Sequence, residues 1–301
     1  MKFIQTDKMN KRLFDNYSHY LPGIRGMFAL FIMFLLGAVL GNIVVLALTA
    51  FLPADLATEL STVVSYPLMF VPPMIFARRR SRMAAIFNTG LAVDSNNFGR
   101  LGGIKMGFAV AFATIAMAFA AEPISALLPA APEWFEQIME SMTGGNIILS
   151  FICVSIFAPL FEEWLCRGVV LRGLLTKMSP AWAIAVSALF FAVLHMNPWQ
   201  ALPAFLLGLL FGYVYYKTGS LKLTMLMHFT NNTMALIFSN IPSFKEAETL
   251  ADVMSPWAYA CLIIVCVLYI AGMIITLRAI PMRSEDAPCN CDEVPALPSA
   301  E

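Results

Sequence analysis

Eight stretches of about 20 mostly apolar residues divide this chain, and they allow very few folds. They lie at roughly 26–52, 61–77, 104–121, 146–165, 181–196, 199–216, 223–240 and 256–277. A helix of about 20 apolar residues crosses the hydrocarbon core of a membrane. Helices are the expected spanning element because lipid offers the backbone N–H and C=O groups no hydrogen-bond partner, so these groups must be satisfied within the chain. The sequence also shows no alternating strands of the kind that form membrane barrels. The predicted fold class is therefore all-α: a polytopic integral membrane protein with about eight transmembrane helices.

Composition and charge placement agree with this fold. Hydrophobic residues make up 59% of the chain and charged residues 13%, against about 45–50% and 25% in soluble proteins. Lys and Arg gather before the first stretch, between the second and third, and after the fourth, sixth and eighth. If both termini are cytoplasmic, every basic residue except Lys245 lies on the inner side, as the positive-inside rule requires. We therefore predict that both termini are cytoplasmic.

The segments outside the stretches predict three parts. Residues 1–25 combine basic residues with apolar positions at helical spacing, which is typical of an amphipathic segment on the inner membrane surface. Residues 26–283 form the helical membrane domain. Residues 284–301 are polar and contain prolines, which predicts a disordered cytoplasmic tail. Within the acidic loop from 122 to 145, a short interfacial helix is expected after Pro132.

The six cysteines do not predict a disulfide framework. Four lie within or beside apolar stretches, whereas Cys289 and Cys291 lie in the predicted cytoplasmic tail, where thiols stay reduced. Two thiolates are too few for a metal site, so the sequence assigns this pair no role.

Ionisable residues inside the apolar stretches point to a functional site. Two of the three histidines, His195 and His228, lie in the fifth and seventh stretches, and the fourth carries Glu162 and Glu163, followed by Arg167. Ionisable side chains at membrane depth are energetically unfavourable and tend to pair or to face a wet cavity. Groups of complementary charge on three separate helices indicate acid–base chemistry inside the membrane.

Helical spacing suggests how these groups divide their roles. Glu163 and Arg167 are four residues apart, so they share a helix face and can form an ion pair. Glu162 is rotated by about 100° from Glu163 and is free to face a cavity as a base. His228 and Asn232 are also four residues apart, so an imidazole and a carboxamide project side by side.

Phe191 and His195 repeat the same spacing on the fifth stretch. A glutamate with one or two histidines can deprotonate a water and direct it at a carbonyl carbon. A histidine and an asparagine can donate hydrogen bonds to the oxyanion that forms. Together these groups supply what amide hydrolysis requires without a nucleophilic serine or cysteine.

Three motifs carry a resemblance to a known family. They are Glu162-Glu163-x-x-x-Arg167-Gly168, Phe191-x-x-x-His195 and His228-x-x-x-Asn232, each on its own apolar stretch. In this order they resemble the motifs of the CAAX proteases and bacteriocin-processing enzymes, the CPBP or Abi family. The resemblance runs from about 146 to 240.

The resemblance implies an intramembrane endopeptidase in a membrane such as the prokaryotic inner membrane. Eukaryotic members remove the last three residues of prenylated CAAX proteins. The implied partners are a peptide or membrane-protein substrate, which is lipidated in the CAAX case, and membrane lipid, with no nucleic acid. The implied catalytic residues are Glu162 as the base, His195 as its partner, and His228 with Asn232 at the oxyanion; the supporting residues are Glu163, Arg167 and Phe191.

Several alternatives stay open from the sequence. Glu162, His195 and His228 could form a zinc set, although we favour a reaction without a cofactor because no His-Glu-x-x-His helix is present. His195 and His228 could instead be axial ligands of a haem. A non-catalytic scaffold or pseudoprotease, or a proton-coupled transporter, would also place ionisable groups in the membrane.

One condition must hold for the residues to meet. His195 lies near the outer end of its stretch, whereas Glu162 lies near the inner end of the fourth. If the fourth helix continues to about Lys177, Glu162 is roughly 22 Å above the inner end of that helix and close to the depth of His195. Arg167 and Arg172 would then be buried or would reach toward the surface.

Overall fold

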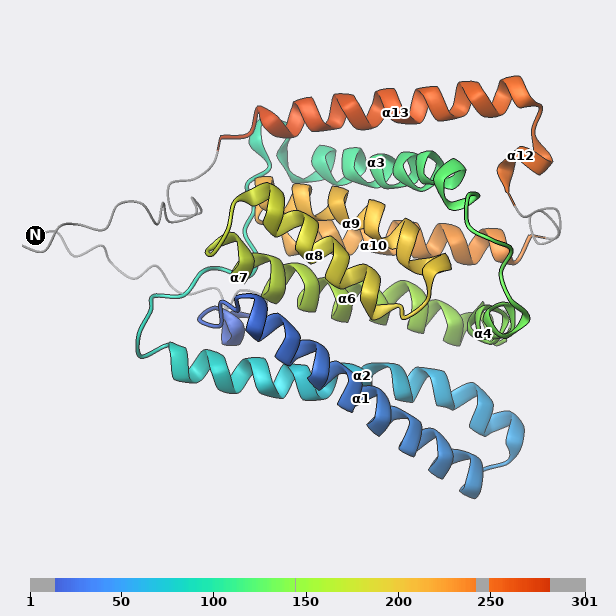
Figure 1. Ribbon diagram of the computed structural model, residues 1–301, viewed down its shortest axis with the longest axis horizontal. Helices are drawn as coiled ribbons and strands as arrows, with labels where there is room; N and C mark the ends of the chain where they lie inside the picture. The colour runs from blue at the N-terminus through green and yellow to red at the C-terminus, as the bar shows by residue number, and fades with distance from the viewer. Residues whose placement is uncertain (1–13, 144, 242–248, 282–301) are drawn as a thin grey trace, which may run out of the picture.

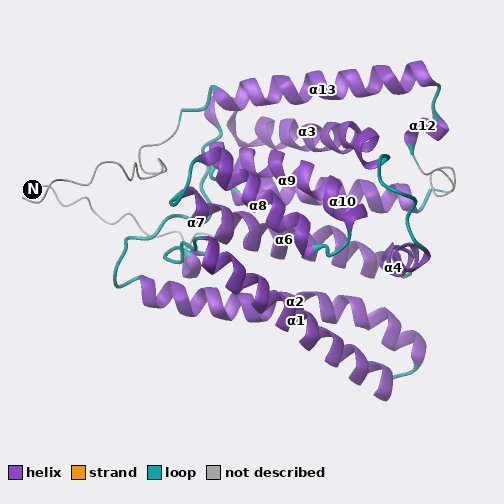
Figure 2. Ribbon diagram, viewed as in Figure 1, coloured by secondary structure: helices purple, strands orange, loops and turns teal. Residues whose placement is uncertain are grey.

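The structure is a computed structural model that describes residues 14–143, 145–241 and 249–281. Over these residues every regular element is a helix, and no strand is present among them (Figure 2). This confirms the all-α fold class.

Each of the eight apolar stretches contains a helix. The helices are α1 (Ile24–Phe51), α2 (Ala54–Ala84), α3 (Gly102–Ser125), the continuous helical segment Ile147–Leu175, α8 (Pro180–Leu194), α9 (Pro198–Thr218), α10 (Leu221–Ser239) and α13 (Pro256–Arg278). Among the described residues, 5 helices are long and apolar enough to cross a membrane: Ile24–Phe51, Gly99–Ser125, Ile147–Leu175, Pro198–Thr218 and Pro256–Arg278. The count of eight transmembrane spans stays a prediction.

Short elements connect and cover these helices. They are the 3₁₀ turns η1 (Asp15–Tyr17) and η2 (Gly99–Leu101), and the helices α4 (Glu133–Thr143) and α12 (Leu250–Val253). The helix expected after Pro132 is present as α4. On α4, Trp134 and Phe135 pack against Trp199, with ring centroids 5.8 and 5.4 Å away. The helix therefore covers the corner at which α8 turns into α9.

The long helices form a bundle with an edge pair on each side (Figure 1). At one edge, α13 packs on α3, which in turn contacts α9 and α10. Helices α8 and α9 form a tight hairpin, and the segment Ile147–Leu175 lies beside it. At the other edge α1 packs along α2, and α2 reaches the bundle through the first half of that segment. The segment with the two glutamates is therefore central.

Residues 14–23 differ from the amphipathic surface helix that the sequence predicted. They form one 3₁₀ turn and a short connection to α1, and Tyr17 and Tyr20 are buried. The Tyr17 ring packs edge-on against Trp164, with a centroid separation of 5.0 Å. The two tyrosine side chains are therefore buried against the bundle and do not form the apolar face of a separate surface helix. Residues 1–13, the tail from 284 to 301, and with it Cys289 and Cys291, lie outside the described residues.

Arg172 holds this N-terminal connection in place. Its side chain is buried, and the guanidinium donates to five backbone carbonyls, those of Tyr17, Ser18, Tyr20, Leu91 and Gly168. An arginine carries five N–H donors in a fixed fork, so one side chain can satisfy carbonyls from three parts of the chain. Arg172 therefore ties the start of the described chain, the loop before α3 and the central segment together.

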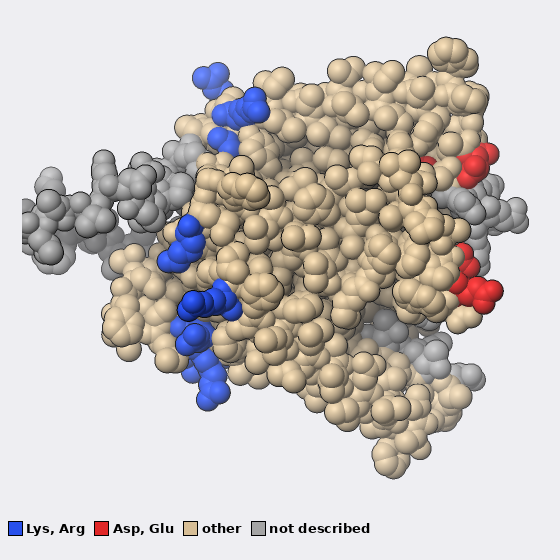
Figure 3. All heavy atoms as spheres, viewed as in Figure 1, with Lys and Arg blue, Asp and Glu red and all other residues tan. Residues whose placement is uncertain are grey.

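Charged side chains separate to the two ends of the molecule (Figure 3). Lys and Arg gather at the end where α1 begins and where α2, α9 and α13 finish, and acidic residues gather at the opposite end. This separation agrees with the charge pattern from which the orientation was predicted. Lys245, the one basic residue expected on the outer side, lies outside the described residues.

We expect a reporter fused after Ser284 to report a cytoplasmic location, because both termini are predicted to lie on the basic side. A reporter inserted between residues 126 and 132 should report an external location. Measuring both with an alkaline phosphatase and fluorescent protein pair tests the orientation. An external reading after Ser284 would contradict it.

We expect Arg172→Lys to lower the stability of the protein by roughly 2 kcal/mol or more, because an ammonium group cannot replace a five-donor fork and would leave buried carbonyls unpaired. The measurement is a thermal melting curve in detergent. Arg79→Lys is the control, since Arg79 is exposed. If the Arg172→Lys and Arg79→Lys proteins melt at the same temperature, Arg172 does not hold the N-terminal connection.

Candidate active site

The central segment positions the two glutamates through an irregular helix. It consists of α5 (Ile147–Ser150), the π-helix η3 (Phe151–Phe157), α6 (Ala158–Glu163), the π-helix η4 (Trp164–Leu171) and α7 (Arg172–Leu175). Short π-helical segments inside α-helices are frequent at functional sites. The pair of glutamates ends α6, between the two π-helices. Because the segment runs to Leu175, the predicted continuation of the fourth helix to about Lys177 is confirmed.

Glu163 and Arg167 form a completely buried ion pair. Arg167 Nη1 lies 2.6 Å from Glu163 Oε1, and both side chains are 0% exposed. The guanidinium also donates to the Gly208 carbonyl at 3.2 Å and lies over the rings of Phe191 and Phe211, at 4.5 and 5.2 Å. A buried charge is tolerated when it is paired and hydrogen-bonded, and both conditions hold here. The predicted pairing of Glu163 with Arg167 is confirmed.

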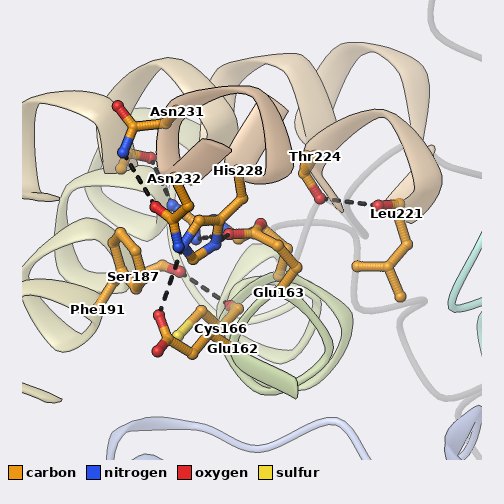
Figure 4. A network of polar contacts seen from close by, with 12 residues as sticks. Glu162, Glu163, Cys166, Ser187, Phe191, Leu221, Thr224, His228, Asn231 and Asn232 are labelled. Atoms are coloured by element: carbon orange, nitrogen blue, oxygen red, sulfur yellow. Dashed lines mark hydrogen bonds and ion pairs between the residues drawn. The ribbon is translucent and has the colours of Figure 1, made fainter. Parts of the chain in front are cut away.

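His228 lies between the two glutamates (Figure 4). Its Nδ1 is 3.0 Å from Glu163 Oε1, and its Nε2 is 3.9 Å from Glu162 Oε2. A carboxylate paired with an arginine can only accept hydrogen bonds, so the Nδ1 atom must carry the proton in that contact. Glu163 thereby fixes the orientation of the ring and leaves Nε2 facing Glu162.

Glu162 has one bound oxygen and one without a partner. Its Oε1 accepts a hydrogen bond from the Tyr66 hydroxyl. Its Oε2 has no hydrogen-bond partner among the described residues, although the side chain is only 13% exposed. Buried polar atoms in proteins are nearly always hydrogen-bonded, to protein or to ordered water. The free oxygen beside Nε2 of His228 therefore marks a polar position that suits a water or a substrate.

The remaining motif residues surround this pair at greater distance. Asn232, one turn after His228, donates from Nδ2 to the Val154 carbonyl at 2.8 Å. His195 follows the last residue of α8, and its Nδ1 lies 3.0 Å from the Phe191 carbonyl. The Phe191 ring contacts both imidazoles, with centroids 5.1 Å from His195 and 5.5 Å from His228. The structure thus places His228 next to Glu162, and both imidazoles in contact with the Phe191 ring.

The histidines and Glu162 are not arranged as a zinc set. Among the described residues, no group of three or more His, Cys, Asp or Glu is placed so that it could hold a metal ion. In this arrangement the described residues supply no such ligand set, and we derive no step through a metal.

Three residues that contribute to this site were not predicted from the sequence. Tyr66 lies on α2, about a hundred residues before the motifs, and nothing in its surroundings distinguishes it from other aromatic residues of the apolar stretches. Phe211 covers the Arg167 guanidinium and packs against His228, with a centroid separation of 6.1 Å. Gly208 supplies a carbonyl to Arg167, and a Cβ atom there would lie 3.1 Å from Cβ of Ala188. The absence of a side chain lets α8 and α9 approach closely at this point.

Comparisons with known proteins locate the site within a family. Residues 144–234 match the model of the type II CAAX prenyl endopeptidase Rce1-like family. An uncharacterized 24.3 kDa protein of Escherichia coli is 28% identical over 118 residues, which cover 37% of this chain and 53% of that protein. The match thus spans about half the length of this relative, and no solved structure matches the chain. The resemblance that the three motifs indicated is therefore confirmed over residues 144–234, which match the model of the type II CAAX prenyl endopeptidase Rce1-like family.

Proposed function

We propose that the protein is an intramembrane endopeptidase that hydrolyses a peptide bond with a water activated by Glu162. The support comes mainly from the contact of His228 with both glutamates. Glu163 binds Arg167 and orients the imidazole through its Oε1, whereas Glu162 presents an oxygen 3.9 Å from Nε2 that accepts no hydrogen bond from the described residues. Glu163 Oε2 also has no hydrogen-bond partner among the described residues, so the support lies in the position of Glu162 Oε2 beside the imidazole.

In the proposed first step, a water lies between Glu162 Oε2 and His228 Nε2. A separation of 3.9 Å allows one water to form hydrogen bonds of about 2.8 Å to both atoms. Glu162 removes a proton from the water as its oxygen bonds to the carbonyl carbon of the scissile peptide. The low dielectric of a site enclosed by helices strengthens this electrostatic interaction.

In the proposed second step, the tetrahedral intermediate collapses. The bond from carbon to nitrogen breaks, the carbonyl re-forms, and the proton held by Glu162 moves to the departing amine. Asn232 fits the role of oxyanion donor, because its amide has two N–H groups and the Val154 carbonyl accepts from one. His195, which contacts the Phe191 ring, stays a predicted member of the site.

The substrate class follows from the family and from the surroundings of the site. The matched family is one of prenyl endopeptidases, so we propose a membrane-associated peptide or protein segment, with a lipidated CAAX-type end as the first candidate. The apolar helices around Glu162 agree with a substrate that reaches the site from the membrane. The rival readings, a proton-coupled transporter or an inactive scaffold, predict no cleavage product.

We expect Glu162→Gln to lower activity by at least about 10²-fold while the protein stays folded, because glutamine keeps the size of the side chain but cannot accept the proton. The measurement begins with a comparison of membrane peptides from cells with the wild-type and the Glu162→Gln protein. Cleavage of a synthetic peptide that spans an identified site is then measured with both purified proteins. Unchanged cleavage would contradict the assignment of Glu162 as the base.

Glu163→Gln serves as the matched control, because it makes the same chemical change one residue away. It removes the negative charge beside the buried Arg167, so we expect a loss of several kcal/mol in stability together with any loss of activity. Detergent melting curves separate the two variants. If Glu162→Gln melts early like Glu163→Gln, the effect of Glu162 is structural.

A further inference from the structure

We propose that Tyr66 is a positioning residue for Glu162, and that α2 therefore contributes to an active site whose other residues come from the matched segment. This inference rests on the proposed function. Its basis is the hydrogen bond from the Tyr66 hydroxyl to Glu162 Oε1, which joins residues 96 positions apart. Tyr66 lies well before residues 144–234, which match the family model.

A stack of aromatic rings holds Tyr66 at this contact. The Tyr66 ring packs on Phe70, one turn along α2, with centroids 5.7 Å apart. Phe70 is 1% exposed and stacks on Phe161, the residue before Glu162, at 5.3 Å and an interplanar angle of 15°. The ring contacts and the hydrogen bond therefore link the same two helices, α2 and α6, at adjacent positions. The ring contacts hold the Tyr66 hydroxyl within hydrogen-bond distance of Glu162 Oε1.

Helix α1 supports this face of α2 from behind. Phe34 of α1 packs edge-on against Phe70 at 5.4 Å. At Gly37 the two helices approach so closely that a Cβ atom would lie 2.2 Å from the Met69 carbonyl oxygen. The hairpin formed by α1 and α2 thus backs the Tyr66 contact with close packing.

The chemical effect of the contact is to fix which oxygen of Glu162 faces His228. The terminal torsion of a glutamate is broad, so an unrestrained carboxylate samples many orientations. A hydroxyl that donates to Oε1 restricts this rotation and leaves Oε2 as the oxygen 3.9 Å from Nε2. Positioning of a reacting group to within a fraction of an ångström strongly affects rate, since a misplacement of 1 Å can lower it by about 10²-fold.

The opposite role would be inhibition, in which the hydrogen bond from the Tyr66 hydroxyl keeps the Glu162 carboxylate from acting as a base until α2 moves away. The geometry favours positioning, because Tyr66 contacts Oε1 while Oε2, the oxygen nearer to His228, has no partner among the described residues. The two roles predict opposite effects when the hydroxyl is removed.

The test is Tyr66→Phe, which removes the hydroxyl and keeps the ring. The control is Tyr215→Phe, which removes a tyrosine hydrogen bond of 2.8 Å to the Val93 carbonyl, in a buried part of the bundle away from Glu162. Each variant is assayed on a synthetic peptide that spans a cleavage site identified by comparing membrane peptides from wild-type and Glu162→Gln cells. We expect Tyr66→Phe to lower kcat by about 10- to 100-fold with KM unchanged, and Tyr215→Phe to keep wild-type kcat.

A second comparison separates positioning from general damage to the fold. Introduced into the Glu162→Gln protein, Tyr66→Phe should have no further effect on kcat, because the residue acts only through Glu162. An equal loss in both backgrounds, wild-type kcat in Tyr66→Phe, or increased activity would each overturn the inference. If Glu162→Gln itself cleaves normally, or no cleavage site depends on the protein, then the proposed function fails and the inference fails with it.

Discussion

The buried contact of Glu163 with both Arg167 and His228 is the interaction on which the site depends. Removal of either charge would leave the other buried without its ionic partner, so the pair holds the central segment in a defined position. The same carboxylate orients the imidazole, which makes Nε2 available to Glu162. In this arrangement the ion pair with Arg167 and the hydrogen bond to His228 share one atom, Glu163 Oε1. Under the proposed mechanism, we expect stability and activity to be coupled at Glu163 and separable at Glu162.

The apolar stretches predicted the helices well, because length and composition decide whether a segment can be helical in lipid. The pairing of Glu163 with Arg167 was equally predictable, since residues four apart on one helix must share a face. The position of His228 was not, because it depends on how α10 rotates against α6, between two π-helices that hydropathy does not reveal. The resemblance assigned His195 as the partner of Glu162, whereas in the structure the nearer imidazole is that of His228.

The contacts made by segments outside the motifs were the least predictable. Residues 14–23 read as an amphipathic surface segment, yet Arg172 binds their carbonyls and draws Tyr17 and Tyr20 into the bundle. Periodicity in a sequence does not indicate that a distant arginine will satisfy backbone groups. The same holds for Tyr66, whose role depends on the packing of α2 against the central segment. Long-range polar contacts, rather than helix formation, are what the sequence left undetermined.

The protonation of His228 tests the central interaction most directly, and it can be measured without a substrate. The chain has three histidines, so the protein labelled with ¹⁵N at histidine gives few signals, and His228→Gln assigns those of His228. We predict that Nδ1 of His228 carries a proton at neutral pH, and that Glu163→Gln weakens this preference, because Glu163 Oε1 accepts from that atom. A neutral ring with its proton on Nε2 alone, in the wild-type protein, would contradict the account.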